Sequence, residues 1–381
     1  MGDTSNFQSK IKKNLYLSFL SILVRDEKRD NMMDILTEIQ KKTSINVYER
    51  SLRNVIGAIM STDDFWEIVA LSEEPLPLVV DIIDTLRRKG YVMVNNGIVL
   101  TEKGKEFASR EGIVRTDEML CRNCSGRGIS IEQFRDVLEE FNRIVKGRPM
   151  PKREFDQGFV TTDTVIARVA FMASRNDIQN KEIFVIGDDD LTSIALMLTN
   201  LPKRIAVIDI DKRLTDFIEK VSEELNYNNI DIFTFDIRDD LPDYIKKKFD
   251  TFITDPPETL YAIKAFVGRG ISSLRAPGCA GYLGLTRRES SLDKWIEIEK
   301  LLVNEFGVVI TDIIKNFNEY VNWGYEEMTR AWELSPVKKK PVRNWYKSYM
   351  IRILTLKNST GFDGKIEVDE ELYNDEESST T

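Results

Sequence analysis

Three consecutive carboxylates follow Gly187, directly after the apolar run at residues 183–186. In nucleotide-binding α/β proteins, the loop at this point is rich in glycine, and its backbone N–H groups meet an anionic part of the ligand. Here the side chains of Asp188, Asp189 and Asp190 take the place of those groups. Because carboxylates repel anions and attract ammonium and sulfonium groups, the loop predicts a cationic ligand.

Further acidic residues follow the next three predicted strands. Asp209 and Asp211 come after the second strand, Asp236 after the third and Asp255 after the fourth. The carboxyl ends of the strands in a doubly wound sheet form one crevice, so these side chains should lie close together. We expect Asp209 or Asp211 to bind the two hydroxyls of a ribose, and Asp236 to bind the amino group of an adenine. Each of them alone would also fit a helix cap or a turn.

The fourth predicted strand is followed by Asp255-Pro256-Pro257-Glu258. Amino-group methyltransferases carry Asn or Asp, two prolines and an aromatic residue at this place. The prolines fix the backbone, so that the preceding side chain points at the amine that attacks the donor. Glu258 stands where the aromatic residue would stack on a planar base, and this exchange favours an aliphatic, cationic amine.

Aromatic and acidic side chains are frequent between residues 317 and 346. They are Tyr320, Trp323, Tyr325, Trp332, Trp345 and Tyr346, together with Glu319, Glu326 and Glu327. Such a set could line a groove for an extended polyammonium chain, because cations bind to aromatic faces and to carboxylates. Aromatic clusters also form ordinary core, so both interpretations stay open.

The composition excludes several kinds of chemistry. The 381 residues include no histidine, so any acid–base step falls to Asp, Glu, Tyr, Lys or Cys. No apolar run approaches the roughly 20 residues of a membrane helix, and the first residues are polar, unlike a signal peptide. Three cysteines give no disulfide framework. We therefore expect a protein of the cytoplasm.

The chain divides into four parts. Residues 1–111 show helical spacing and then a helix, a hairpin and another helix, which predicts a winged-helix-like α+β domain. Residues 112–158 form a connector with a Cys-x-x-Cys motif. Residues 159–360 alternate strands and helices. Residues 361–381 form an acidic tail that is expected to be disordered.

The first domain could bind DNA or mediate dimerisation. Asp81 and Asp84 lie on the presumed recognition helix, whose basic residues crowd into the last turn and fit the helix dipole without DNA. We therefore expect a homodimer and no nucleic acid partner. Cys121 and Cys124 supply half of a tetrahedral metal site, so they either share a metal between two copies or form a simple turn. No metal is expected in the active site.

Seven strands are predicted in the third part, at residues 183–186, 204–208, 230–235, 251–254, 281–285, 308–314 and 349–356. A long irregular stretch accompanies the last two strands. This arrangement is typical of the Rossmann-like methyltransferase fold, an α/β doubly wound sheet whose final strand inserts antiparallel.

On these motifs the chain resembles the branched-chain polyamine synthases of archaea and bacteria, the N(4)-bis(aminopropyl)spermidine synthases. The shared features are the Gly-Asp-Asp-Asp motif at 187–190, Asp255-Pro256-Pro257, Asp156-Gln157 followed by Thr161 and Thr164, and the first domain. The resemblance covers nearly the whole chain, apart from the acidic tail.

The resemblance implies an aminopropyltransferase without a tightly bound cofactor. Decarboxylated S-adenosylmethionine, the co-substrate, would donate an aminopropyl group to the internal secondary amine of spermidine and then to the resulting tertiary amine, with release of methylthioadenosine. Asp189 or Asp190 would orient and deprotonate the attacking nitrogen, and Asp255 would fix the acceptor. Substrate and donor would be bound by Gly187, Asp188, Asp209, Asp211, Asp236, Pro256, Pro257, Glu258, Asp156 and Gln157. Which adjacent acid is the base stays open, because neighbouring carboxylates share their titration, and so does the number of groups added.

Two other functions fit parts of the same pattern. An N-methyltransferase that uses S-adenosylmethionine itself would need a partner for the donor carboxylate, and the three adjacent carboxylates do not supply one. A winged-helix regulator that senses polyamines would bind DNA, and its affinity for DNA would fall steeply as salt rises.

Overall fold

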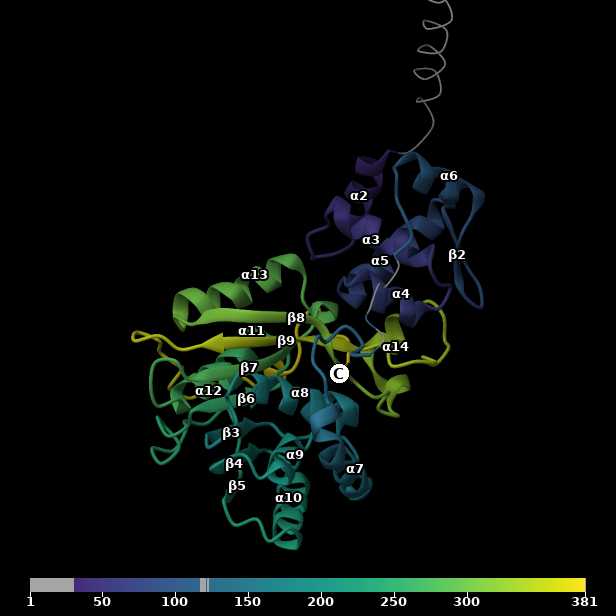
Figure 1. The fold of residues 1–381 in the computed structure, drawn as a ribbon. Helices are drawn as coiled ribbons and strands as arrows, with labels where there is room; N and C mark the ends of the chain where they lie inside the picture. The colour runs from purple at the N-terminus through teal and green to yellow at the C-terminus, as the bar shows by residue number, and fades with distance from the viewer. Residues whose placement is uncertain (1–30, 117–120, 122, 381) are drawn as a thin grey trace, which may run out of the picture.

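The computed structural model describes residues 31–116, 121 and 123–380. Its ribbon consists of a group of N-terminal helices and a larger α/β part built around one sheet (Figure 1). The first 30 residues of the segment with predicted helical spacing lie outside the described residues.

The N-terminal part contains short amphipathic helices and one hairpin. Its elements are α2 (Met32–Gln40), α3 (Glu49–Ile59), α4 (Phe65–Ser72), α5 (Leu76–Arg88), β1 (Val92–Val94), β2 (Ile98–Leu100) and α6 (Glu102–Arg110). On α5, Asp84 forms ion pairs with Lys42 at 2.5 Å and with Arg87 at 2.8 Å. Charged groups at the end of this helix are thus paired with one another on the surface of the chain. The winged-helix assignment stays a prediction.

One seven-stranded sheet forms the centre of the larger part, with the order β5-β4-β3-β6-β7-β9-β8. The strands are β3 (Glu182–Ile186), β4 (Arg204–Asp209), β5 (Ile230–Thr234), β6 (Thr251–Thr254), β7 (Ala280–Leu285), β8 (Val309–Glu319) and β9 (Lys347–Leu354). The first five strands run parallel, and β9 inserts antiparallel between β7 and β8. The predicted Rossmann-like methyltransferase-type sheet is confirmed.

Helices cover both faces of this sheet because its strands are apolar on both sides. Ile183 and Val185 of β3 belong to one core cluster, and the alternate residues Phe184 and Ile186 belong to the other. The first cluster contains residues of α7 (Arg135–Ile144), α8 (Thr162–Ser174), α9 (Thr192–Thr199) and α10 (Lys212–Glu224). The second contains residues of α11 (Leu260–Ala262), of a π-helical turn (Ile263–Gly268), of α12 (Arg269–Ser273) and of α13 (Leu292–Lys300).

The acidic C-terminal segment is folded, so the expected disorder of residues 361–381 is wrong for residues 361–380. Leu372 is fully buried, and Ile366 is nearly so. Lys294 Nζ lies 2.6 Å from the carboxylate of Asp375. The acidic composition predicted disorder wrongly because the burial of Leu372 and Ile366 and the ion pair with Lys294 stabilise this segment.

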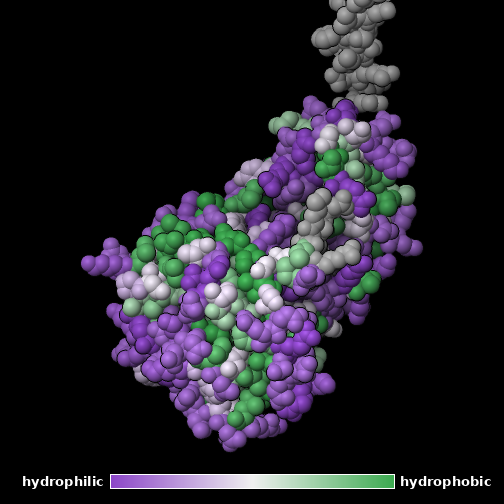
Figure 2. All heavy atoms as spheres, in the orientation of Figure 1, coloured by the Kyte–Doolittle hydropathy of each residue, from purple (hydrophilic) through white to green (hydrophobic). Residues whose placement is uncertain are grey.

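Most of the surface on the side shown in Figure 2 is hydrophilic, and hydrophobic residues gather over α13 and β8. Leu292, Ile296, Val309 and Ile313 are exposed there.

In the part of the chain that the structure describes, no helix is long and apolar enough to cross a membrane. Cys121 is exposed and Cys124 partly buried, both as free thiols, and a metal shared between two copies stays a prediction.

Candidate active site

The carboxyl ends of β3, β4, β5 and β6 open into a cavity with about 1020 Å³ of empty space, part of it open to solvent. Six of its lining residues are acidic, and the described residues place no lysine or arginine in the lining. The acidic residues are Asp156, Asp189, Asp209, Asp236, Asp255 and Glu258. A wall of this kind attracts cations and repels phosphate and carboxylate groups.

Most of the predicted site residues meet at this cavity. Besides the six acids, Gly187, Gln157, Pro256 and Pro257 line it. Asp188, Asp190 and Asp211 do not, although all three were expected to face a ligand. They lie behind the lining, where each holds a neighbouring part of the chain.

Asp188 makes hydrogen bonds within the protein and does not line the cavity. Its carboxylate accepts a hydrogen bond from the N–H of Ser193, 3.2 Å away in the first turn of α9, and its own N–H donates to Asp209 Oδ2 at 2.8 Å. Burial raises the pKa of the Asp188 carboxyl from 3.8 to about 7. Asp188 therefore caps α9 and orients Asp209.

Asp188→Asn should raise the free energy of unfolding at pH 8 by about 1 kcal/mol or more, because the buried carboxylate is ionised at that pH and the asparagine is not. Each unit of difference between the folded and unfolded pKa values corresponds to about 1.4 kcal/mol. The folded protein binds a proton at Asp188 more tightly than the unfolded chain, so this residue's contribution to stability is present below pH 3.8 and lost as pH rises through about 7. The side-chain oxygen of asparagine still accepts the hydrogen bond from the N–H of Ser193, but the side chain can no longer ionise. Urea unfolding at pH 5 and pH 8 measures the difference, and an equal change at both pH values would contradict the assignment.

Asp189 is the member of the motif that reaches the cavity. Its Oδ2 accepts a hydrogen bond from the N–H of Gly158 at 3.1 Å, and the side chain of Arg148 donates to its main-chain carbonyl. Arg148 in turn stacks on the ring of Phe159, 3.7 Å from its centre. Burial, and then the nearby Asp190, raises the pKa of the Asp189 carboxyl well above its usual range. Such a carboxylate is suited to take a proton.

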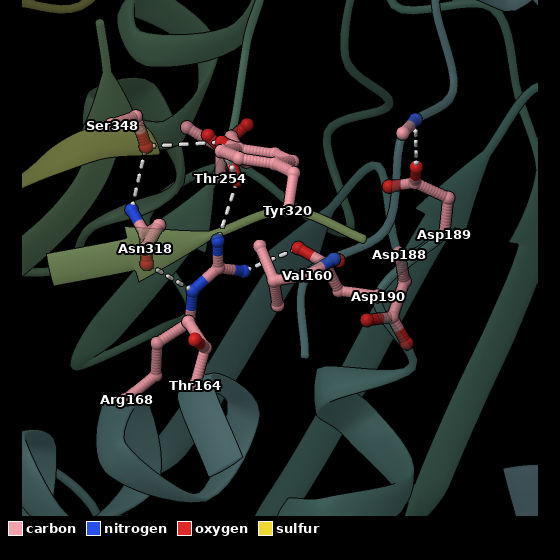
Figure 3. A network of polar contacts seen from close by, with 12 residues as sticks. Val160, Thr164, Arg168, Asp188, Asp189, Asp190, Thr254, Asn318, Tyr320 and Ser348 are labelled. Atoms are coloured by element: carbon pink, nitrogen blue, oxygen red, sulfur yellow. Dashed lines mark hydrogen bonds and ion pairs between the residues drawn. The ribbon is translucent and has the colours of Figure 1, made fainter. Parts of the chain in front are cut away.

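Asp190 and Asp255 share one buried arginine, Arg168, whose contact with Asp190 is visible in Figure 3. Arg168 of α8 lies 2.5 Å from Asp190 Oδ2 and 2.5 Å from Asp255 Oδ2. Asp190 also accepts from the N–H of Val160 at 2.7 Å, and Tyr320 donates its hydroxyl to Asp255 at 2.7 Å. Arg168 was missed from sequence, where the available signal is one arginine inside the apolar run of residues 165–170.

The second and third strand ends form one end of the cavity. Asp209 Oδ1 accepts from the N–H of Asp211 at 2.7 Å, and Asp209 remains in the lining. Asp211 itself caps α10, accepting from the N–H of Arg213 at 3.0 Å. Of the two acids expected at a ribose, only Asp209 is therefore in place. Asp236 is paired with Arg238 at 2.7 Å.

Aromatic residues line the other end of the cavity, near Asp156 and Glu258. They are Tyr320, Trp323, Tyr325 and Tyr346. Burial, and then the nearby Glu289, raises the pKa values of the carboxyls of Asp156 and Glu258 well above the usual range. The groove interpretation thus fits four of the six aromatic residues, whereas Trp332 and Trp345 lie outside the lining, as do Glu319, Glu326 and Glu327.

The C-terminal segment also contributes to the lining, which sequence reasoning missed. Tyr373 and Thr380 line the cavity, and Thr380 donates its hydroxyl to Asp156 Oδ1 at 3.2 Å. Buried Glu289 accepts from the backbone N–H groups of Ser379 at 2.8 Å and Thr380 at 2.9 Å. These bonds fix the segment at the aromatic end of the cavity.

Comparisons with known proteins agree on one family. Residues 136–380 match the family model described as the C-terminal domain of branched-chain polyamine synthase A. The N(4)-bis(aminopropyl)spermidine synthases of Thermococcus kodakarensis and Methanocaldococcus jannaschii are 61% and 60% identical, and each alignment covers 92% of this chain and 100% of the relative. The crystal structure of a branched-chain polyamine synthase from Thermus thermophilus, in complex with N4-aminopropylspermidine and 5'-methylthioadenosine, aligns with a TM-score of 0.84 at 37% identity, over 92% of this chain and 98% of that chain.

Proposed function

We propose, since this chain belongs to the branched-chain polyamine synthase family, that it transfers aminopropyl groups from decarboxylated S-adenosylmethionine to spermidine. The acceptor is the internal secondary amine, then the resulting tertiary amine, and methylthioadenosine is released. The observation that carries this proposal is the cavity wall, which has six acidic residues and, within the described chain, no basic one. Both substrates are polycations.

The same wall explains the choice of donor. Intact S-adenosylmethionine carries a carboxylate beside its ammonium group, and among the described residues the lining offers it neither a cation nor a glycine-rich loop. Without that carboxylate the propyl arm ends in an ammonium group, which carboxylates such as Asp189 stabilise. Asp209 would hold the ribose, and Asp236 would meet the adenine.

Transfer requires a free electron pair on the acceptor nitrogen and an in-line approach to the carbon next to sulfur. The new N–C bond forms as the C–S bond breaks, and both electrons of that bond go to sulfur. The proton of the acceptor nitrogen passes to Asp189. Asp255, Glu258 and Asp156 hold the remaining ammonium groups of the acceptor in place by charge.

Mass spectrometry of the products tests the proposal. The purified chain is incubated with spermidine and either decarboxylated or intact S-adenosylmethionine. Aminopropyl masses added to the internal nitrogen, with the decarboxylated donor only, are the expected result, and the number added is read from the same spectrum. A methyl mass with the intact donor would identify a methyltransferase instead.

The absence of any product with either donor would favour a polyamine-sensing regulator. A gel shift with DNA at increasing salt then tests that alternative.

The homodimer expected from sequence is proposed as the state in solution. Light scattering of the eluting protein measures it.

A further inference from the structure

Three acidic residues near the reacting atoms differ in what neutralises them. Asp190 and Asp255 both pair with Arg168 at 2.5 Å. In the described part of the chain, the carboxylate of Asp189 accepts a hydrogen bond only from the backbone N–H of Gly158 and forms no ion pair. Arg148 reaches the main-chain carbonyl of Asp189 and leaves its carboxylate open.

Arg168 is held rigidly behind the cavity wall. Its side chain is 3% exposed, and its Nε donates to Asn318 Oδ1 at 2.9 Å. Asn318 donates in turn to Ser348 Oγ at 2.8 Å (Figure 3). A guanidinium fixed at three nitrogens can orient two carboxylates at once, which an ammonium group cannot do.

We propose that Arg168 is a positioning residue that fixes Asp190 and Asp255 and thereby leaves Asp189 as the base. This inference rests on the proposed function, and it decides which of the adjacent acids takes the proton. Asp190, bound by Arg168 and by the N–H of Val160, is a structural partner of the arginine. Asp255 keeps its place at the acceptor because Arg168 and Tyr320 both hold its Oδ2.

Replacement of the arginine separates this role from simple stabilisation. Arg168→Lys keeps one positive charge but reaches one carboxylate at a time, so we expect kcat to fall about tenfold while the KM for the donor stays unchanged. Arg168→Gln should lower kcat further. Asp190→Asn should cost less than tenfold, because the amide oxygen still accepts from Val160. Arg143→Gln, on an exposed pair of α7, is the matched control without effect.

Arg168 lies outside the cavity lining, so its replacement should leave the binding of methylthioadenosine unchanged. Calorimetric titration with methylthioadenosine therefore measures the fraction of folded, binding-competent protein in every variant. If Arg168→Gln does not fold, Arg168→Lys decides. Wild-type kcat in a lysine variant that binds one methylthioadenosine per chain would overturn the inference, and so would an Asp190→Asn variant as inactive as Asp189→Asn. A wild type without any aminopropylated product overturns the proposed function, whereas an active wild type with unchanged variants overturns only the role of Arg168.

Discussion

Asp189→Asn is expected to lower kcat about 1,000-fold, in the middle of the range of about 100-fold to 10,000-fold that general acid–base catalysis contributes. The asparagine keeps the shape of the side chain and its acceptor for the N–H of Gly158, but it cannot take a proton. The affinity for methylthioadenosine should stay the same, because Asp209, the residue proposed to hold the ribose, is unchanged in this variant. Single-turnover kinetics with saturating spermidine measures the effect on the chemical step.

Asp243→Asn is the matched control for this substitution. Asp243 has a fully exposed side chain and lies outside the cavity lining. It should retain wild-type turnover. A loss of less than tenfold for Asp189→Asn would remove this residue from the role of base.

Gly284→Ala is expected to lower kcat about 100-fold, although it adds only one uncharged methyl group. A Cβ at this position of β7 would lie 1.9 Å from Oδ1 of Asp255 and 2.6 Å from its carboxyl carbon. The carboxylate must therefore move, and it then loses its alignment with Arg168 and Tyr320. A displacement of about 1 Å at a catalytic centre can cost about 100-fold in rate.

Gly147→Ala provides the matched control. Its Cβ would meet only the ring of Phe217 at 3.5 Å, which is an ordinary contact. Neither glycine has a positive φ, so alanine brings no backbone strain at either place. Unchanged turnover in Gly284→Ala, with the variant folded by circular dichroism, would show that the position of Asp255 does not limit the reaction.

Local patterns predicted the centre of the sheet well because β3, β4 and β6 are short, largely apolar runs that are followed by polar residues. Ile183 to Ile186 and Thr251 to Thr254 were placed to within one residue of the observed strands. The antiparallel insertion of β9 followed from the spacing of the last two strands. By contrast, the folded acidic segment could not be predicted, because its stability depends on Lys294 and on Glu289, which are distant in sequence.

The sequence by itself determined the family, the fold and the acidic character of the strand ends. Those properties follow from residue types at strand ends, and the parallel sheet brings such ends together whatever the details of packing. Only the tertiary structure decided which acid lines the cavity. Within one motif, Asp188 caps a helix, Asp190 pairs with Arg168 and Asp189 lines the cavity. Adjacent residues of a loop point in different directions, and the partners of Asp189 and Asp190 lie 22 to 31 residues away in the chain, so no local pattern records the difference.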